Sequence, residues 1–146
     1  MPELDIEQIA GDREIPDDVR DEWETFQNYL ADGAPYHIGE FVAKYLRVNE
    51  RRLESPGLYE ETRELPEEVY AIMQELGLRV QFRKLVSELQ SIIAGRSEAI
   101  ENGDSAARWN ITLATSQVRT EIERTIGFPI YWELRMNGKS KIELIT

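Results

Sequence analysis

LRVQFRKLVSELQSII, residues 78–93, repeats apolar side chains at spacings of four, three, four and three. The repeat is formed by Leu78, Phe82, Leu85, Leu89 and Ile92. Such a spacing is typical of an amphipathic helix whose apolar stripe packs along a second helix. The stretch therefore predicts a mainly α-helical chain.

A second long helix is expected directly after this one. Asn102 and Gly103 interrupt the pattern, and Asp104 or Ser105 is a suitable N-cap for a helix that runs to Gly127. Its apolar stripe consists of Ala107, Ile111, Ala114, Val118, Ile122 and Ile126. Because the connection between the two stripes is short, the helices should form an antiparallel pair.

Three further helices are expected upstream, over about 16–30, 35–52 and 66–77. Each begins close to a proline, namely Pro16, Pro35 and Pro66, and proline is well tolerated in the first helical turn. The sequence thus predicts about five helices in one bundle-like body over residues 16–127, preceded by an arm over residues 1–15 in which apolar residues are sparse.

The negative charge is concentrated at the start of the chain. Residues 1–32 hold eleven acidic and two basic side chains, whereas residues 33–146 hold 17 acidic and 15 basic side chains, within a total net charge of -11. An acidic front of this kind attracts basic surfaces and repels phosphate groups. A protein partner or self-association is therefore favoured, and nucleic acid is disfavoured.

The apolar period changes to two after residue 128. Ile130, Trp132, Leu134 and Met136 alternate with polar or larger amphipathic residues, a pattern typical of a strand with one buried face. Asn-Gly at 137–138 is a strong hairpin signal. The sequence therefore predicts a two-stranded β-hairpin over residues 128–146, belonging to the same domain.

Two surfaces are candidates for partner contact. One is the acidic start of the first body helix and the other is the expected hairpin, whose strand edges could accept another chain. The candidate residues are Asp17, Asp18, Asp21, Glu22, Glu24, Trp132, Leu134, Arg135, Lys139 and Lys141.

Support for catalysis or for a cofactor is weak in this sequence. His37 is the only histidine and there is no cysteine, so His37 and Glu40 would supply only half of a typical zinc site. Neither a nucleophile elbow nor a glycine-rich phosphate loop is present. No metal, cofactor or small-molecule ligand is therefore expected, and a small enzyme using His37 and Glu40 ranks as the last alternative.

The favoured function is a non-catalytic assembly or adaptor subunit, most concretely a virion component of the phage connector or neck type. An acidic inhibitor that fills a basic groove on another protein is the alternative. The lack of cysteine, of a signal-like start and of a long apolar run favours a cytoplasmic or virion-associated protein with no membrane contact.

Overall fold

The computed structural model describes residues 4–33, 36, 38–48 and 65–145. Its elements are α1 (Ile6–Ala10), α2 (Asp17–Ala31), α3 (Gly39–Tyr45), α6 (Glu67–Glu75), α7 (Arg79–Glu101), α8 (Ser105–Ile122), η1 (Glu123–Gly127), α9 (Phe128–Met136) and α10 (Lys141–Ile145). The described residues are mainly helical and contain no strand, which confirms the mainly α class.

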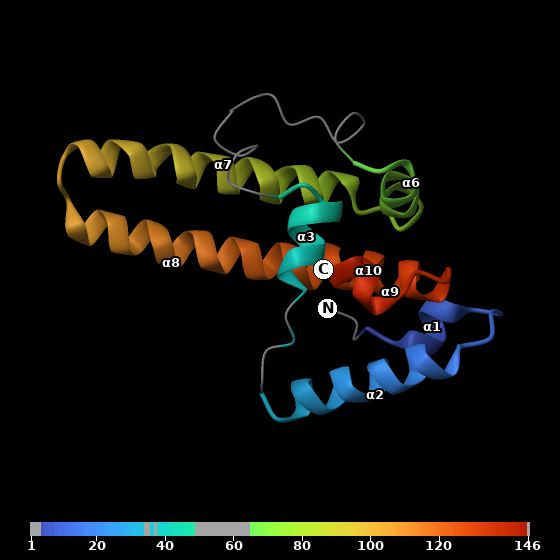
Figure 1. The fold of residues 1–146 in the computed structure, drawn as a ribbon. Helices are drawn as coiled ribbons and strands as arrows, with labels where there is room; N and C mark the ends of the chain where they lie inside the picture. Colours follow the sequence, from blue (N-terminus) through green and yellow to red (C-terminus); the bar gives the residue numbers. More distant parts are fainter. Residues whose placement is uncertain (1–3, 34–35, 37, 49–64, 146) are drawn as a thin grey trace.

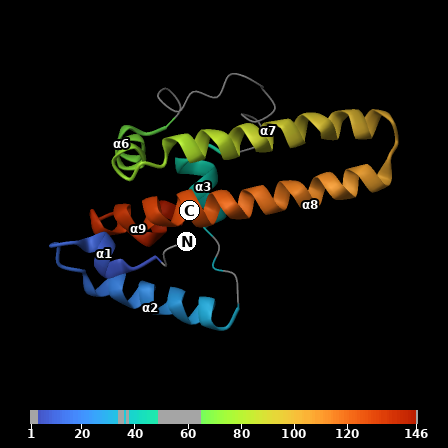
Figure 2. The ribbon, with the colours of Figure 1, turned by 180° about the vertical axis from the view of Figure 1, so that it is seen from behind.

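The two longest helices, α7 and α8, form an antiparallel hairpin (Figure 1). The side chain of Asp104 accepts a hydrogen bond from the Ala107 N–H at 3.0 Å, so Asp104 is the N-cap of α8. The far half of the hairpin extends beyond every other described element, as the reverse view also shows (Figure 2). The near half packs over α3 and the body of the protein.

The helix of α8 does not stop at Gly127 but continues through η1 into α9. Within η1, a π-helical turn, the Phe128 N–H donates to the carbonyl of Glu123, five residues earlier. Pro129 follows at once. Proline has no N–H, and its ring clashes with the carbonyl four residues earlier in an α-helix. The wider turn before Pro129 therefore lets the chain remain helical.

The predicted β-hairpin over residues 128–146 is wrong, because this segment forms α9 and α10. Seven of the nine residues of α9 are buried, including Tyr131 and Arg135 on the side that the alternating pattern assigned to solvent. A helix covered on nearly all sides has no polar face, so its period cannot be read from hydrophobicity.

The Asn-Gly pair at 137–138 ends α9 instead of turning a hairpin. Gly138 has a φ of 99°, and the Lys139 N–H donates to the carbonyl of Leu134 at 3.0 Å. A positive φ just after a helix is the usual way to close its last turn. The expected hairpin turn at 137–138 is therefore wrong, and Gly138 closes the last turn of α9.

Residues 4–15, expected as an arm, lie against α9. Ile6, Ala10 and Ile15 are buried in the core. The guanidinium of Arg13 pairs with Glu133 at 2.8 Å and donates to the Asn137 side chain at 2.9 Å. The start of the chain thus covers one side of α9, while α2 and α6 cover others (Figure 1).

The contact between α3 and η1 is close and depends on a glycine. A Cβ atom on Gly127 would lie 3.2 Å from side-chain atoms of both Ile38 and Val42. The Ile38 N–H also donates to Glu123 Oε1 at 2.6 Å, which ties the start of α3 to η1. Any larger residue would therefore push the Ile38 and Val42 side chains away by a few tenths of an ångström.

We expect Gly127→Val to lower the free energy of unfolding by about 1–3 kcal/mol, because it overpacks this contact. Gly95→Ala is the matched control: nothing lies within 4 Å of the added Cβ, so alanine should raise the free energy of unfolding by roughly 1 kcal/mol through helix propensity. Urea unfolding followed by circular dichroism measures both, and a Gly127→Val variant as stable as wild type would contradict the close packing.

Candidate functional site

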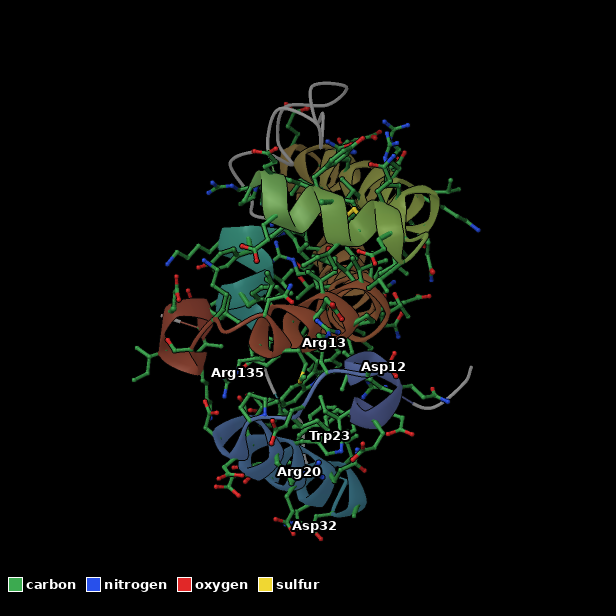
Figure 3. All side chains as sticks on the ribbon, turned by 90° about the vertical axis from the view of Figure 1, so that its right-hand side faces the viewer. Asp12, Arg13, Arg20, Trp23, Asp32 and Arg135 are labelled. Atoms are coloured by element: carbon green, nitrogen blue, oxygen red, sulfur yellow. The ribbon has the colours of Figure 1, made fainter. Side chains whose placement is uncertain are left out.

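Glu22 is a buried carboxylate between α2 and α9. Its Oε1 accepts a hydrogen bond from Arg135 Nε at 2.7 Å. Its Oε2 accepts from the hydroxyls of Tyr36 at 2.9 Å and Tyr131 at 2.5 Å. Both oxygens are therefore satisfied by protein donors. Figure 3 shows Arg135 directed from α9 toward α2.

Arg135 uses its remaining nitrogens to bind two other parts of the chain. One terminal nitrogen donates to the Lys139 carbonyl at 2.7 Å, and the other donates to Asp18 Oδ2 at 3.2 Å. The side chain is only 4% exposed. A single guanidinium thus joins α2, α9 and the connection that leads to α10.

Burial and the neighbouring charges fix the protonation states of Tyr36, Tyr131 and Arg135. Burial raises the pKa of Tyr131, and its hydrogen bond to the Glu22 carboxylate raises it further. Burial and Glu22 act on the pKa of Tyr36 in the same direction. For Arg135, burial lowers the pKa, but hydrogen bonds and charge from Glu22 outweigh it and raise the pKa above its usual value. At neutral pH the tyrosines are neutral and the arginine is charged.

The acidic residues predicted for partner contact divide into two groups. Asp17, Asp21 and Glu24 are exposed and share the outer side of α2, one turn apart. Asp18 is 70% exposed and also pairs with Arg135, whereas Glu22 points inward. Glu22 follows Val19 by three residues and precedes Phe26 by four, and this place in an apolar stripe is the sequence signal for a buried carboxylate.

The candidates from the expected hairpin are mostly internal. Trp132 and Leu134 are buried, and the Trp132 ring lies 5.1 Å from that of Trp23, edge to face. Lys139 lies within 4 Å of two carboxylates, and Lys141 lies 5.9 Å from the Tyr36 ring centre. Without the hairpin, these residues do not form the expected second surface.

A different apolar surface lies on the projecting part of α8. Trp109 is 64% exposed and Leu113, one turn further on, is 45% exposed. Residues 105–118 contain one charged side chain, Arg108, which is also exposed. We call Arg108, Trp109 and Leu113 the α8 face. The near absence of charge over 105–118 is visible in the sequence, whereas the predicted apolar stripe lies on the opposite side of this helix.

Three other features bear on the site. His37 lies outside the described residues, and Glu40 is exposed at the start of α3. Among the described residues, His, Asp and Glu side chains do not cluster in threes that could hold a metal ion. Within the same residues, none of the helices has the length and apolar character needed to cross a membrane.

Over the described residues, these features define a mainly α-helical protein with a buried ion-pair cluster and a projecting helical hairpin. No protein-family model, no curated protein and no solved structure matches this chain.

We expect Arg135→Met to lower the free energy of unfolding by about 3–5 kcal/mol, because it leaves the Glu22 carboxylate buried without a counter-charge. Adding Glu22→Met should recover part of that loss, since no buried charge then remains. Arg20→Met is the control: Arg20 and Glu7 form an exposed pair at 3.2 Å, and its loss should cost less than about 1 kcal/mol. Equal effects of the two single arginine changes in urea unfolding would contradict the proposed role of Arg135.

The stability should fall at alkaline pH with a slope that depends on Tyr131. Since the pKa of Tyr131 is raised in the folded state, the unfolded chain loses this proton first above about pH 10. Below about pH 10 Tyr131 is protonated in both the folded and the unfolded chain, so this group adds no pH dependence there. Above about pH 10 the free energy of unfolding falls by up to about 1.4 kcal/mol per pH unit for each such tyrosine. Tyr131→Phe should flatten this slope, whereas Tyr29→Phe, at an exposed position, should not. Unfolding measured between about pH 8 and 11 compares the three proteins.

Proposed function

We propose that this protein is a non-catalytic assembly or adaptor subunit that binds another protein through the α8 face. The observation that carries the proposal is the exposure of Trp109, at 64%, on a helical hairpin that extends beyond the other described elements (Figures 1 and 2). A large aromatic side chain in this position leaves apolar surface in water unless a partner covers it.

The composition of this surface is that of an interface core. Charged residues are depleted at the centres of protein interfaces, while tryptophan is enriched and often contributes most of the binding energy. Trp109 and Leu113 follow this pattern, because they lie one turn apart and Arg108 is the only charged side chain over 105–118. A helix of the partner could cover both side chains at once.

The hairpin is also held in a defined position. α8 continues through η1 into α9, and α9 lies in the core with Trp132 and Tyr131 fully buried. The α8 face therefore lies on a formed helix that packs along α7 and continues into the core, so binding does not have to fold this segment. Preorganisation of this kind reduces the entropic cost of association.

The setting we propose is a virion component of the connector or neck type, supported by a small helical body that carries a projecting hairpin. The alternative is an acidic inhibitor, supported by the exposed carboxylates of Asp17, Asp21 and Glu24 on the outer side of α2. The two proposals differ in the surface that a partner would contact, so one experiment separates them.

The experiment is affinity capture with the tagged full-length chain in lysate from its natural source. We expect Trp109→Asp to lose at least ten-fold of the captured partner, because it places a charge at the centre of the contact. Val80→Asp is the matched control, since Val80 is 82% exposed on α7 and lies outside the α8 face.

A third variant combines Asp17→Asn, Asp21→Asn and Glu24→Gln. It leaves Asp18 and Glu22 in place because both bind Arg135 and their loss would disturb the fold. Loss of the partner in this variant alone would favour the acidic inhibitor. If the Trp109→Asp chain retains every protein that wild type retains, the copies of this chain included, the α8 face is not the binding surface.

A further inference from the structure

A second exposed apolar site lies at the end of α2. Tyr29 is 44% exposed and Leu30 is 49% exposed, in the last turn before the helix ends. The exposed carboxylate of Asp32 follows directly. We call Tyr29, Leu30 and Asp32 the α2 end.

On the basis of the proposed function, we infer that the partner of the α8 face is a second copy of this chain, which contributes its α2 end. In this contact Trp109 and Leu113 of one copy pack on the apolar pair of the next. Arg108 of the first copy then lies near Asp32 of the second.

Charge selects this pairing over the others. Two chains of net charge -11 repel one another, so they can associate only where unlike charges meet or charge is absent. The α8 face carries the exposed Arg108 and no acid, with Asp104 one turn before it, whereas the α2 end carries the exposed Asp32 and no base. Pairing two α8 faces would bring arginines together, and pairing two α2 ends would bring acids together.

The apolar parts of the two sites are also matched. Each has one large aromatic and one leucine side chain, and all four are between 44% and 64% exposed. Tryptophan and tyrosine are the residues that most often anchor protein interfaces. The Tyr29 ring is held against Tyr36, with ring centres 5.6 Å apart, so it is already positioned for contact.

The two sites lie apart on the same molecule, as both ribbon views show (Figures 1 and 2). One copy therefore cannot satisfy its own α2 end with its own α8 face. When two copies bind head to tail, one copy still has an unoccupied α8 face and the other still has an unoccupied α2 end. Such contacts continue until a ring closes or an open chain forms.

Sedimentation velocity on the purified full-length chain tests this inference. We expect wild type to form species larger than a dimer as its concentration rises. Trp109→Ser and Leu30→Ser should each weaken this association at least ten-fold. An equimolar mixture of the two variants should form a one-to-one heterodimer, because each variant retains the surface that the other lacks.

A charge exchange supplies an independent test of the same contact. Arg108→Glu should weaken association at least ten-fold. Adding Asp32→Lys to the same chain should restore it, because the introduced carboxylate of one copy would then meet the introduced ammonium group of the next. Val80→Ser removes an exposed apolar side chain elsewhere on the surface and should leave association unchanged. Circular dichroism confirms that each variant is folded.

Two results would overturn the inference. A wild-type chain that stays monomeric at every concentration excludes self-association, while the capture experiment still decides whether the α8 face binds another protein. A finite dimer whose two variants fail to complement each other shows that like surfaces pair, and the head-to-tail arrangement is then wrong.

Discussion

Burial of the Glu22 carboxylate restricts where α2 can lie on the rest of the protein. A carboxylate removed from water needs a counter-charge and hydrogen-bond donors, and Arg135, Tyr36 and Tyr131 supply them. Apolar contacts between α2 and α9, such as Phe26 with Trp132, tolerate small shifts, whereas this cluster does not. The cluster therefore favours the side of α2 that carries Glu22 facing α9, and the exposed carboxylates of α2 lie on its other side.

The long helices could be predicted from sequence because each has one exposed polar side and one buried apolar side. The stripes of α7 and α8 and the cap at Asp104 all lie in segments with a polar face. The segment 128–146 lacked this contrast. Ile130, Tyr131 and Trp132 follow one another around α9 and all three are buried, so the alternation of apolar and polar residues does not correspond to a buried and an exposed side. The helix α1 within residues 4–15 cannot be predicted for a related reason, since a helix of five residues has too few positions to show a period.

The candidate site was predicted only in part. Asp17, Asp21 and Glu24 are exposed, as a charged surface requires, but Glu22 has an internal role that depends on a partner 113 positions away. Such a pairing cannot be read from one sequence, although the place of Glu22 among apolar residues shows that some partner is needed. Trp109 cannot be singled out from the sequence, because a lone exposed aromatic is common and the projection of α8 beyond the body is visible only in the structure.

The uninterrupted path from α8 through η1 to α9 places two different selective pressures on one helix. Substitutions over 123–136 must preserve the interior, where Gly127 and Tyr131 leave little room for change. Residues 105–118 are restricted only on the side that packs against α7, where Val118 is buried, and the exposed side of this stretch is free to vary. Homologous chains should therefore diverge quickly at one end of this helix and slowly at the other, and the boundary between the two rates should fall near the π-helical turn.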